Sequence, residues 1–168
     1  MSARGIRYAE GLKVLPVLAP VDTAATAVNT SSVNLNEAHW ITFLVQLGNF
    51  TSDSTDTVQI TVESSTADST AAGDTAQVFN HRLASAVATD NMGAISTATS
   101  SGVELGASSD DDKLLVVDVD PAVLTAADVD ANFVKVVITP SSDTAILLVD
   151  VIAVVEPRYP GNSMRTAT

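Results

Sequence analysis

The sequence predicts an all-β protein: a single β-sandwich or jelly roll of about eight to ten strands, with one short helix and extended terminal arms. Short runs rich in Val and Ile recur along the chain, and turn residues separate them at intervals of roughly 8–12 residues. Serine and threonine make up 36 of the 168 residues, and both suit exposed strand faces and loops better than helices. No repeat of fixed period is visible, so a propeller or a solenoid is not expected.

The chain begins with a segment, residues 1–12, that lacks apolar periodicity and is expected to be an extended arm. Over residues 13–27, Pro16 and Pro20 exclude a central strand, because proline has no N–H to donate to a ladder. An edge strand or a wrapping segment is therefore expected there. Residues 28–35 predict a weak strand.

Two strongly patterned strands are expected over residues 37–48 and 56–63. In the first, alternation places Trp40, Thr42, Leu44 and Gln46 on one face and Ile41, Phe43, Val45 and Leu47 on the other. In the second, the side chains expected to point inward are Val58, Ile60 and Val62. The polar turn between them predicts an antiparallel hairpin. Small polar residues over 64–74 then predict a loop.

The middle of the chain carries weaker strand signals and the one expected helix. A strand is predicted over residues 76–84, short strands over 94–99 and 103–105, and a strong strand over 114–119. The helix is expected over residues 121–130. It has Asp120 as its N-cap and Pro121 at its first position, where proline is tolerated.

The last third of the chain is expected to organise the fold. Two apolar strands over residues 133–139 and 145–155, joined by turn residues over 140–143, predict a hairpin. The second strand is too apolar for a sheet with one wet face, so it should have both faces covered, or one face against a partner. Because such a face needs a cover, a dimer or trimer of the chain is expected.

The domain boundaries expected from these patterns are an N-terminal arm over 1–12, a β-sandwich over 13–161 and a C-terminal tail over 162–168. The chain has no cysteine, which excludes disulfides and cysteine nucleophiles. The first residues lack the apolar core of a secretory signal, and the longest apolar run is too short to span a bilayer as a helix. The protein is therefore expected to be made in the cytoplasm, without membrane partners.

Charge is unevenly placed along the chain. Residues 14–156 contain three basic and nineteen acidic residues, whereas the two ends contain five basic residues and Glu10. So acidic a body argues against nucleic acid as a partner, because that affinity depends on Lys and Arg neutralising phosphates. The basic ends are either adhesive arms or simply exposed, charged termini.

No catalytic residue, metal site or cofactor is expected. His39 and His81 are the only side chains with an unperturbed pKa near neutrality. Serine and aspartate are so abundant that a Ser-His-Asp combination carries no information, and no Gly-x-Ser-x-Gly turn is present. The aspartates near 110–112, 118–120 and 128–130 do not match the calcium-binding loop of helix-loop-helix proteins, so they are expected to be solvated. The protein is not expected to be an enzyme.

Four segments together resemble a group of small structural proteins of tailed bacteriophages, the head decoration or cement class. The segments are VNLNEAHWITFLV (33–45), TVQITVE (57–63), FVKVVITP (133–140) and EPRYPG (156–161). The resemblance implies a β-rich virion protein, located on the capsid surface, that binds the major capsid protein and stabilises the shell. It transfers no functional residue, because the class has no catalytic motif.

Arginine and tyrosine are favoured at protein interfaces. The residues of these types expected to contact the capsid or neighbouring copies therefore lie at the basic ends, namely Arg4, Arg7, Tyr8, Arg158, Tyr159 and Arg165.

Two other functions remain open. One is a receptor- or carbohydrate-binding sandwich of a phage fibre, which would need an exposed aromatic platform; the single Trp40 lies in a strand expected to be core. The other is a head–tail joining or tail protein. Copy number per particle distinguishes such a joint from shell decoration.

Overall fold

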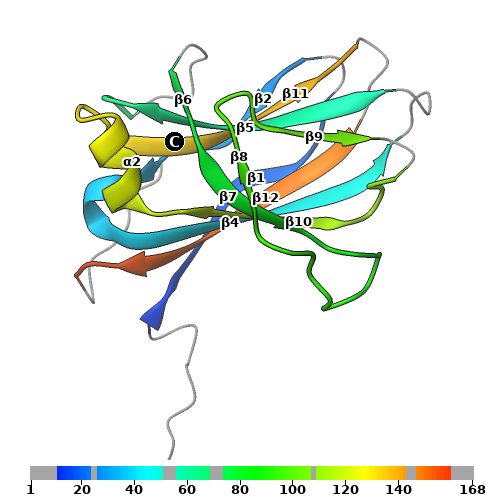
Figure 1. Ribbon diagram of the computed structural model, residues 1–168, viewed down its shortest axis with the longest axis horizontal. Helices are drawn as coiled ribbons and strands as arrows, with labels where there is room; N and C mark the ends of the chain where they lie inside the picture. Colours follow the sequence, from blue (N-terminus) through cyan, green and yellow to red (C-terminus); the bar gives the residue numbers. More distant parts are fainter. Residues whose placement is uncertain are drawn as a thin grey trace, which may run out of the picture.

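The computed structural model describes residues 11–23, 26–50, 56–68, 74–106, 109–142 and 147–159. Within them the chain forms two antiparallel six-stranded sheets that face each other, with one short α-helix at one end (Figure 1). The predicted all-β sandwich is confirmed. The described part contains twelve strands, so the expected eight to ten is too low. The segments 28–35 and 76–84, each expected to be one strand, both divide into two.

Sheet A contains the three longest strands, β4, β12 and the edge strand β1. Its strands lie in the order β1-β12-β4-β10-β7-β8. Pro16 and Pro20 lie in β1 at the sheet edge, as the two prolines predict, and β1 pairs with β12 through an irregular register. The bounds are β1 Lys13–Asp22, β12 Leu147–Pro157, β4 Ala38–Phe50, β10 Leu114–Val119, β7 Phe79–Leu83 and β8 Ser96–Ala98.

Sheet B is built around β11 and β5, which pair over their whole length. Its main order is β2-β11-β5-β6, with β3 also beside β11 and β9 also beside β5. The bounds are β2 Val28–Asn29, β3 Val33–Asn34, β11 Phe133–Pro140, β5 Thr57–Ser65, β6 Thr75–Gln77 and β9 Val103–Gly106.

The helix α2 (Pro121–Ala127) begins where the sequence predicts and ends three residues before the expected Asp130. The Asp120 side chain accepts a hydrogen bond from the Ala122 N–H at 2.9 Å, which satisfies a backbone donor that the first turn leaves free. A short 3-10 turn, η1 (Leu35–Glu37), lies between β3 and β4 and was not expected.

The core lies between the two sheets and follows the predicted alternation. The apolar side chains expected on one face of β4 and those expected to point inward from β5 are all fully buried. Each such side chain contributes about 1.5–3 kcal/mol through removal of its apolar surface from water. These buried residues are Ile41, Phe43, Val45, Leu47, Val58, Ile60 and Val62.

Both predicted hairpins are wrong. The strands β4 and β5, and likewise β11 and β12, lie in opposite sheets, so each turn carries the chain across the sandwich. Instead β4 pairs with β12 in sheet A, and β5 pairs with β11 in sheet B. Alternation of side chains determines which face of a strand is buried, but it does not determine which strand lies beside it.

Two arrangements were expected for the 145–155 segment, with both faces covered or with one face against a partner, and the chain itself covers only one face of β12. In β12 the odd-numbered residues from Leu147 to Val155 are buried against sheet B. The even-numbered residues point the other way and remain half-buried or exposed.

Candidate binding surface

The side chains of sheet A that point away from sheet B form a surface with an apolar centre, here named the outer face. Strand register places Pro16 beside Ile152, and Ile152 beside Leu44. Leu44 lies beside Val116 in turn, so apolar residues from four neighbouring strands form one row across the sheet. Ile152, Leu44 and Val116 are only half-buried. Monomeric proteins rarely leave a contiguous apolar patch of this kind open to water unless it contacts something.

Further apolar residues extend the outer face along β12 in both directions from this row. Val14 is paired with Val154 and is 53% exposed. Leu148, near the other end of β12, is 52% exposed. Between them, Asp150 is paired with Gln46 and interrupts the apolar surface with a polar pair.

Trp40 lies on the outer face and not in the core, so the expectation that excluded an exposed aromatic platform is wrong. It is 39% exposed and is paired with Glu156 of β12. A depression of about 280 Å³ lies beside its indole ring. That depression is lined by Leu12, Trp40, Thr42, Leu44, Val154 and Glu156.

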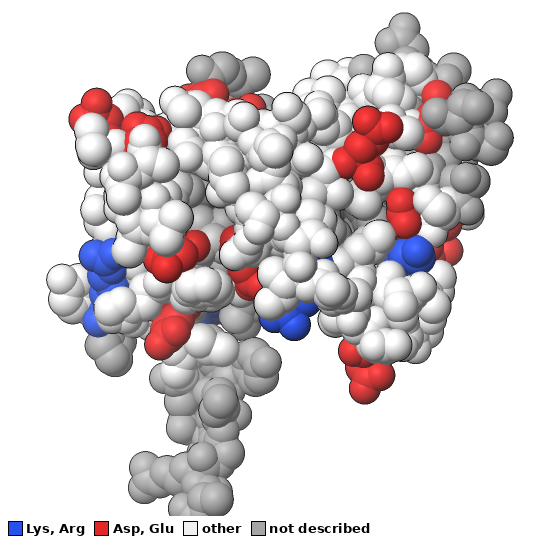
Figure 2. Space-filling model, in the orientation of Figure 1, with Lys and Arg blue, Asp and Glu red and all other residues white. Residues whose placement is uncertain are grey.

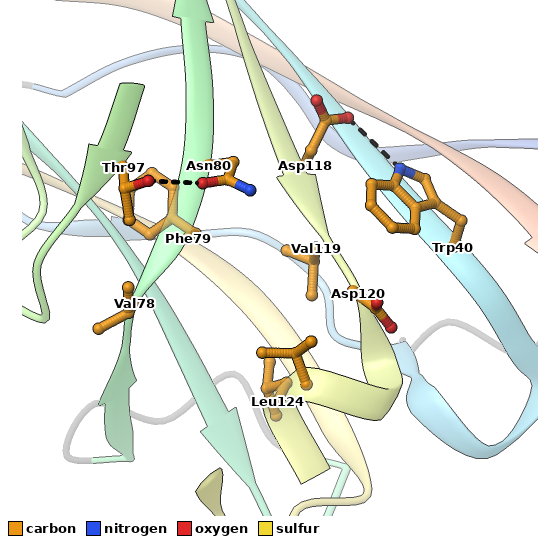
Figure 3. Close-up of a pocket in the computed structure, with 10 residues that line it drawn as sticks. Trp40, Val78, Phe79, Asn80, Thr97, Asp118, Val119, Asp120 and Leu124 are labelled. Carbon is orange, nitrogen blue, oxygen red and sulfur yellow. Dashed lines mark hydrogen bonds between the residues drawn. The ribbon is translucent and has the colours of Figure 1, made fainter. Parts of the chain in front are cut away.

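A second depression, of about 270 Å³, lies next to Trp40 on the side of β10 (Figure 3). It opens beyond the Asn80–Asp118 pair, the last pair that joins β7 to β10. There the chain enters β7 from sheet B at Val78, and β10 turns into α2. The lining residues are Trp40, Val78, Phe79, Asn80, Thr97, Asp118, Val119, Asp120, Val123 and Leu124.

Polar side chains at the mouth of this second depression are held in place by hydrogen bonds. The Asp118 Oδ1 accepts a hydrogen bond from Thr42 Oγ1 at 2.8 Å and a longer one, at 3.5 Å, from the Trp40 indole N–H. The Asn80 Oδ1 accepts one from Thr97 Oγ1 at 2.8 Å. The carboxylate, the amide and the indole therefore come from three neighbouring strands and have defined orientations.

Of the residues predicted to contact partners, two lie in the described part of the chain. The Arg158 N–H donates to the Glu37 carbonyl at 2.8 Å, and its Nε donates to the Ala38 carbonyl at 2.9 Å. Arg158 thus links the segment just after β12 to the start of β4 through two hydrogen bonds. Tyr159 is exposed. Arg4, Arg7, Tyr8 and Arg165 lie outside the described residues.

The surface carries far more acidic than basic groups, and Figure 2 shows red patches spread over a largely uncharged face with few blue ones. Two of the three basic residues between positions 14 and 156 form ion pairs within the protein. Lys135 is fully buried, with its Nζ 2.8 Å from Asp74 and 3.6 Å from Glu63. Lys113 forms an ion pair with Asp110 at 3.3 Å.

Two aspartates of the 109–112 turn accept hydrogen bonds, from within the turn and from the strands β9 and β4 beside it. Asp110 accepts hydrogen bonds from the Gly106 N–H and from Ser109 Oγ, and Asp111 accepts one from the Phe50 N–H. In the described ranges no group of three His, Cys, Asp or Glu side chains is placed to hold a metal ion.

The two histidines lie in different environments. His39 is exposed on β4. His81 lies in β7 with its ring 6.0 Å from that of Phe79, in an edge-on arrangement. Its Nδ1 is buried and finds no hydrogen-bond partner among the residues that the structure describes.

Burial lowers the pKa of His81 from its ordinary value of 6.5, because the charged imidazolium is poorly solvated there. Between the lowered pKa and 6.5 the unfolded chain binds a proton that the folded chain does not. We therefore expect the contribution of His81 to stability to be complete above pH 6.5 and to decrease as the pH falls through this window. Urea unfolding midpoints at neutral and mildly acidic pH measure it.

The comparison with variants isolates this effect from the many carboxylates that titrate at lower pH. When the pH falls from neutral into this window, the stability of a His81→Gln variant should decrease less than that of the parent protein. The matched His39→Gln variant, altered at the exposed histidine of β4, should behave like the parent protein. Equal pH dependence in the parent and in His81→Gln would show that His81 makes no contribution.

Searches against known proteins give little. No protein-family model matches the chain, and no curated protein matches it. Among solved structures, one titled "Structure of infectious bursal disease virus Gt strain" aligns with 94% of this chain, at 8% sequence identity and a TM-score of 0.25. The alignment covers 43% of that structure's chain, and a similarity this weak carries no argument about function. Among the described residues there is also no helix with the length and apolar character to cross a membrane.

Proposed function

We propose that this chain is a structural virion protein that binds the outside of a phage capsid and stabilises it. The observation that supports this most is the outer face of sheet A. It presents a row of half-buried apolar side chains from four strands on an otherwise acidic protein. Such a face gains free energy when another protein covers it, because apolar surface leaves water.

The composition of the outer face fits a protein partner. Apolar side chains form its central row, the polar pair of Asp150 and Gln46 lies beside that row, and Glu156 lies near the end of β12. A centre of this kind with a polar rim is the usual anatomy of a protein interface. Arg158 and Tyr159 directly follow β12 and are exposed, and both residue types are common in interface hot spots. The partners proposed are the major capsid protein and further copies of this chain, as a dimer or trimer.

The test replaces the two most exposed apolar residues of the outer face with lysine. The double variant Val14→Lys, Leu148→Lys should bind virions lacking the protein at least tenfold more weakly, because charges would be buried without partners at the interface. The isolated variant should keep the far-ultraviolet circular dichroism of the parent, since both side chains are more than half exposed. Co-sedimentation of added protein with particles, quantified on gels, measures the binding.

A matched control tests whether the position matters rather than the added charge. Ala126→Lys with Val129→Lys alters two exposed apolar residues, one in α2 and one in the segment after it, that lie outside the strands of sheet A. This pair should bind particles like the parent protein. Equal loss in both double variants would mean that added charge alone is responsible, and no loss in either would remove the outer face as the capsid-binding surface.

Copy number separates shell decoration from a joining protein. A decoration protein covers the whole shell, so quantitative mass spectrometry of purified virions should find it in a number comparable to the capsid subunits. A single ring of copies would instead assign the chain to a head–tail joint or the tail.

A further inference from the structure

We infer that the depression between β7, β10 and α2 is a carbohydrate-binding site, with Trp40 as its aromatic wall. The site takes one ring of a neutral sugar or an amino sugar. A sugar ring presents an apolar C–H face and a rim of hydroxyl groups, so a protein that recognises it needs an aromatic or apolar surface with donors and acceptors beside it. The depression offers both kinds of contact.

The apolar part of the site has an exposed rim above a buried floor. Val78 and Val123 are 62% and 64% exposed at its rim, and Trp40 is the only tryptophan of the chain. Beneath them, Phe79 and Leu124 are buried and form a rigid floor. At about 270 Å³ the space lies just below the range typical of drug-sized ligands, which suits a single small ring.

The polar part of the site combines an acceptor and a donor at hydroxyl spacing. Asn80 and Asp118 are directly opposite each other across the β7–β10 pair, where side chains lie about 4.5–5.5 Å apart at Cβ. Asp118 uses Oδ1 for Thr42 and Trp40, and its Oδ2 has no partner among the described residues. Asn80 uses its oxygen for Thr97, which leaves the amide N–H groups to donate. One sugar hydroxyl can therefore donate to Asp118 while it, or its neighbour on the ring, accepts from Asn80.

The charge of the site selects among sugars. Asp118 and Asp120 both line it, and none of its lining residues is basic. Sialic acids, uronic acids and sulfated sugars would meet two carboxylates without a compensating cation, so they are rejected. Neutral hexoses and N-acetylhexosamines are accepted, and an amino sugar gains an additional attraction.

The experiment uses the intrinsic fluorescence of the full-length protein, because its single tryptophan lines this site. The probes are galactose, maltotriose, N-acetylglucosamine and chitotriose, with N-acetylneuraminic acid as the anionic sugar. At least one of the neutral probes should give a saturable change in emission, and the anionic sugar should give none. Saturable binding of the anionic sugar in preference to the neutral ones would overturn the assignment.

Two variants locate the binding. Asp118→Asn keeps an oxygen that can accept the hydrogen bond from Thr42 but loses the negative charge. It should lower the affinity for the sugar about tenfold, as expected when a hydrogen bond to a charged group is lost. The matched Asp90→Asn, at an exposed loop position outside the site, should bind like the parent protein. Trp40→Ala should abolish sugar binding, whereas Trp40→Phe should retain part of it. Binding by both variants is measured by calorimetry, because they lack the tryptophan emission.

Several results would overturn the inference. One is the absence of a saturable change in emission with every neutral probe. Another is an equal affinity for the sugar in the parent protein and in Asp118→Asn. Binding of an arginine-rich peptide without binding of any sugar would do the same, because it would make the depression a peptide contact. Binding of virions does not enter this test, so the sugar site and the capsid-binding face can fail independently.

Discussion

Replacing Phe43 with alanine should lower the free energy of unfolding by about 3–5 kcal/mol, the range measured for large-to-small changes at buried aromatic positions. Phe43 is the largest fully buried side chain in the described structure. It lies on the inner face of β4 between Val117 of β10 and Ala153 of β12. Because both neighbours are small and are held by strand pairing, they cannot move in to fill the space, and a cavity remains.

Urea unfolding followed by circular dichroism measures this loss, and two controls define its cause. Phe43→Leu retains most of the volume and should cost roughly 1–1.5 kcal/mol. Val129→Ala removes an apolar side chain that is 84% exposed, and it should change stability by less than about 0.5 kcal/mol. If Phe43→Ala cost no more than Val129→Ala, the inner face of β4 would not be the centre of the core.

The same strand shows how far the sequence alone predicts this structure. Period-two alternation in β4 correctly separates Phe43 and Val45 from Thr42 and Gln46, because a strand turns successive side chains to opposite faces. Trp40 shares the face of Thr42 and Gln46, so its exposure was already indicated by the pattern. The expectation that it was buried came from the apolar character of the strand as a whole.

Strand pairing could not be predicted in the same way. A polar turn after β4 and another after β11 fit a hairpin and a crossing between sheets equally well, since both need only turn residues. The crossing at Val78 carries no signal, because neither Gly nor Pro interrupts the apolar segment there. The second depression is formed by that crossing together with the β10–α2 corner, so the sequence could supply its residues but not their proximity.

For the buried Lys135, the sequence pattern predicts a need for an acidic partner but not both of the partners found. A lysine in the middle of the apolar run of β11 indicates a buried charge, and a buried charge needs a partner of opposite sign. Glu63 lies directly opposite it in the register of β11 and β5. Asp74, the nearer partner, comes from just before β6 and could not be predicted from strand periodicity.

Replacing Lys135 with methionine should lower the free energy of unfolding by about 3 kcal/mol at neutral pH. Removing one member of a buried ion pair typically costs 3–5 kcal/mol, because the remaining charge is left uncompensated. The lower end applies here, since the carboxylates of Glu63 and Asp74 keep 17% and 20% of their side-chain exposure and are partly hydrated. Methionine fills much of the volume of the lysine stem, so a cavity does not account for the loss.

The origin of this loss can be tested by removing the stranded negative charges as well. The triple variant Lys135→Met, Glu63→Gln, Asp74→Asn should regain more than half of the lost stability, because buried ion pairs contribute little beyond the cost of their own desolvation. A triple variant no more stable than Lys135→Met would mean that Lys135 stabilises the sandwich through the packing of its methylene groups between the sheets rather than through its charge.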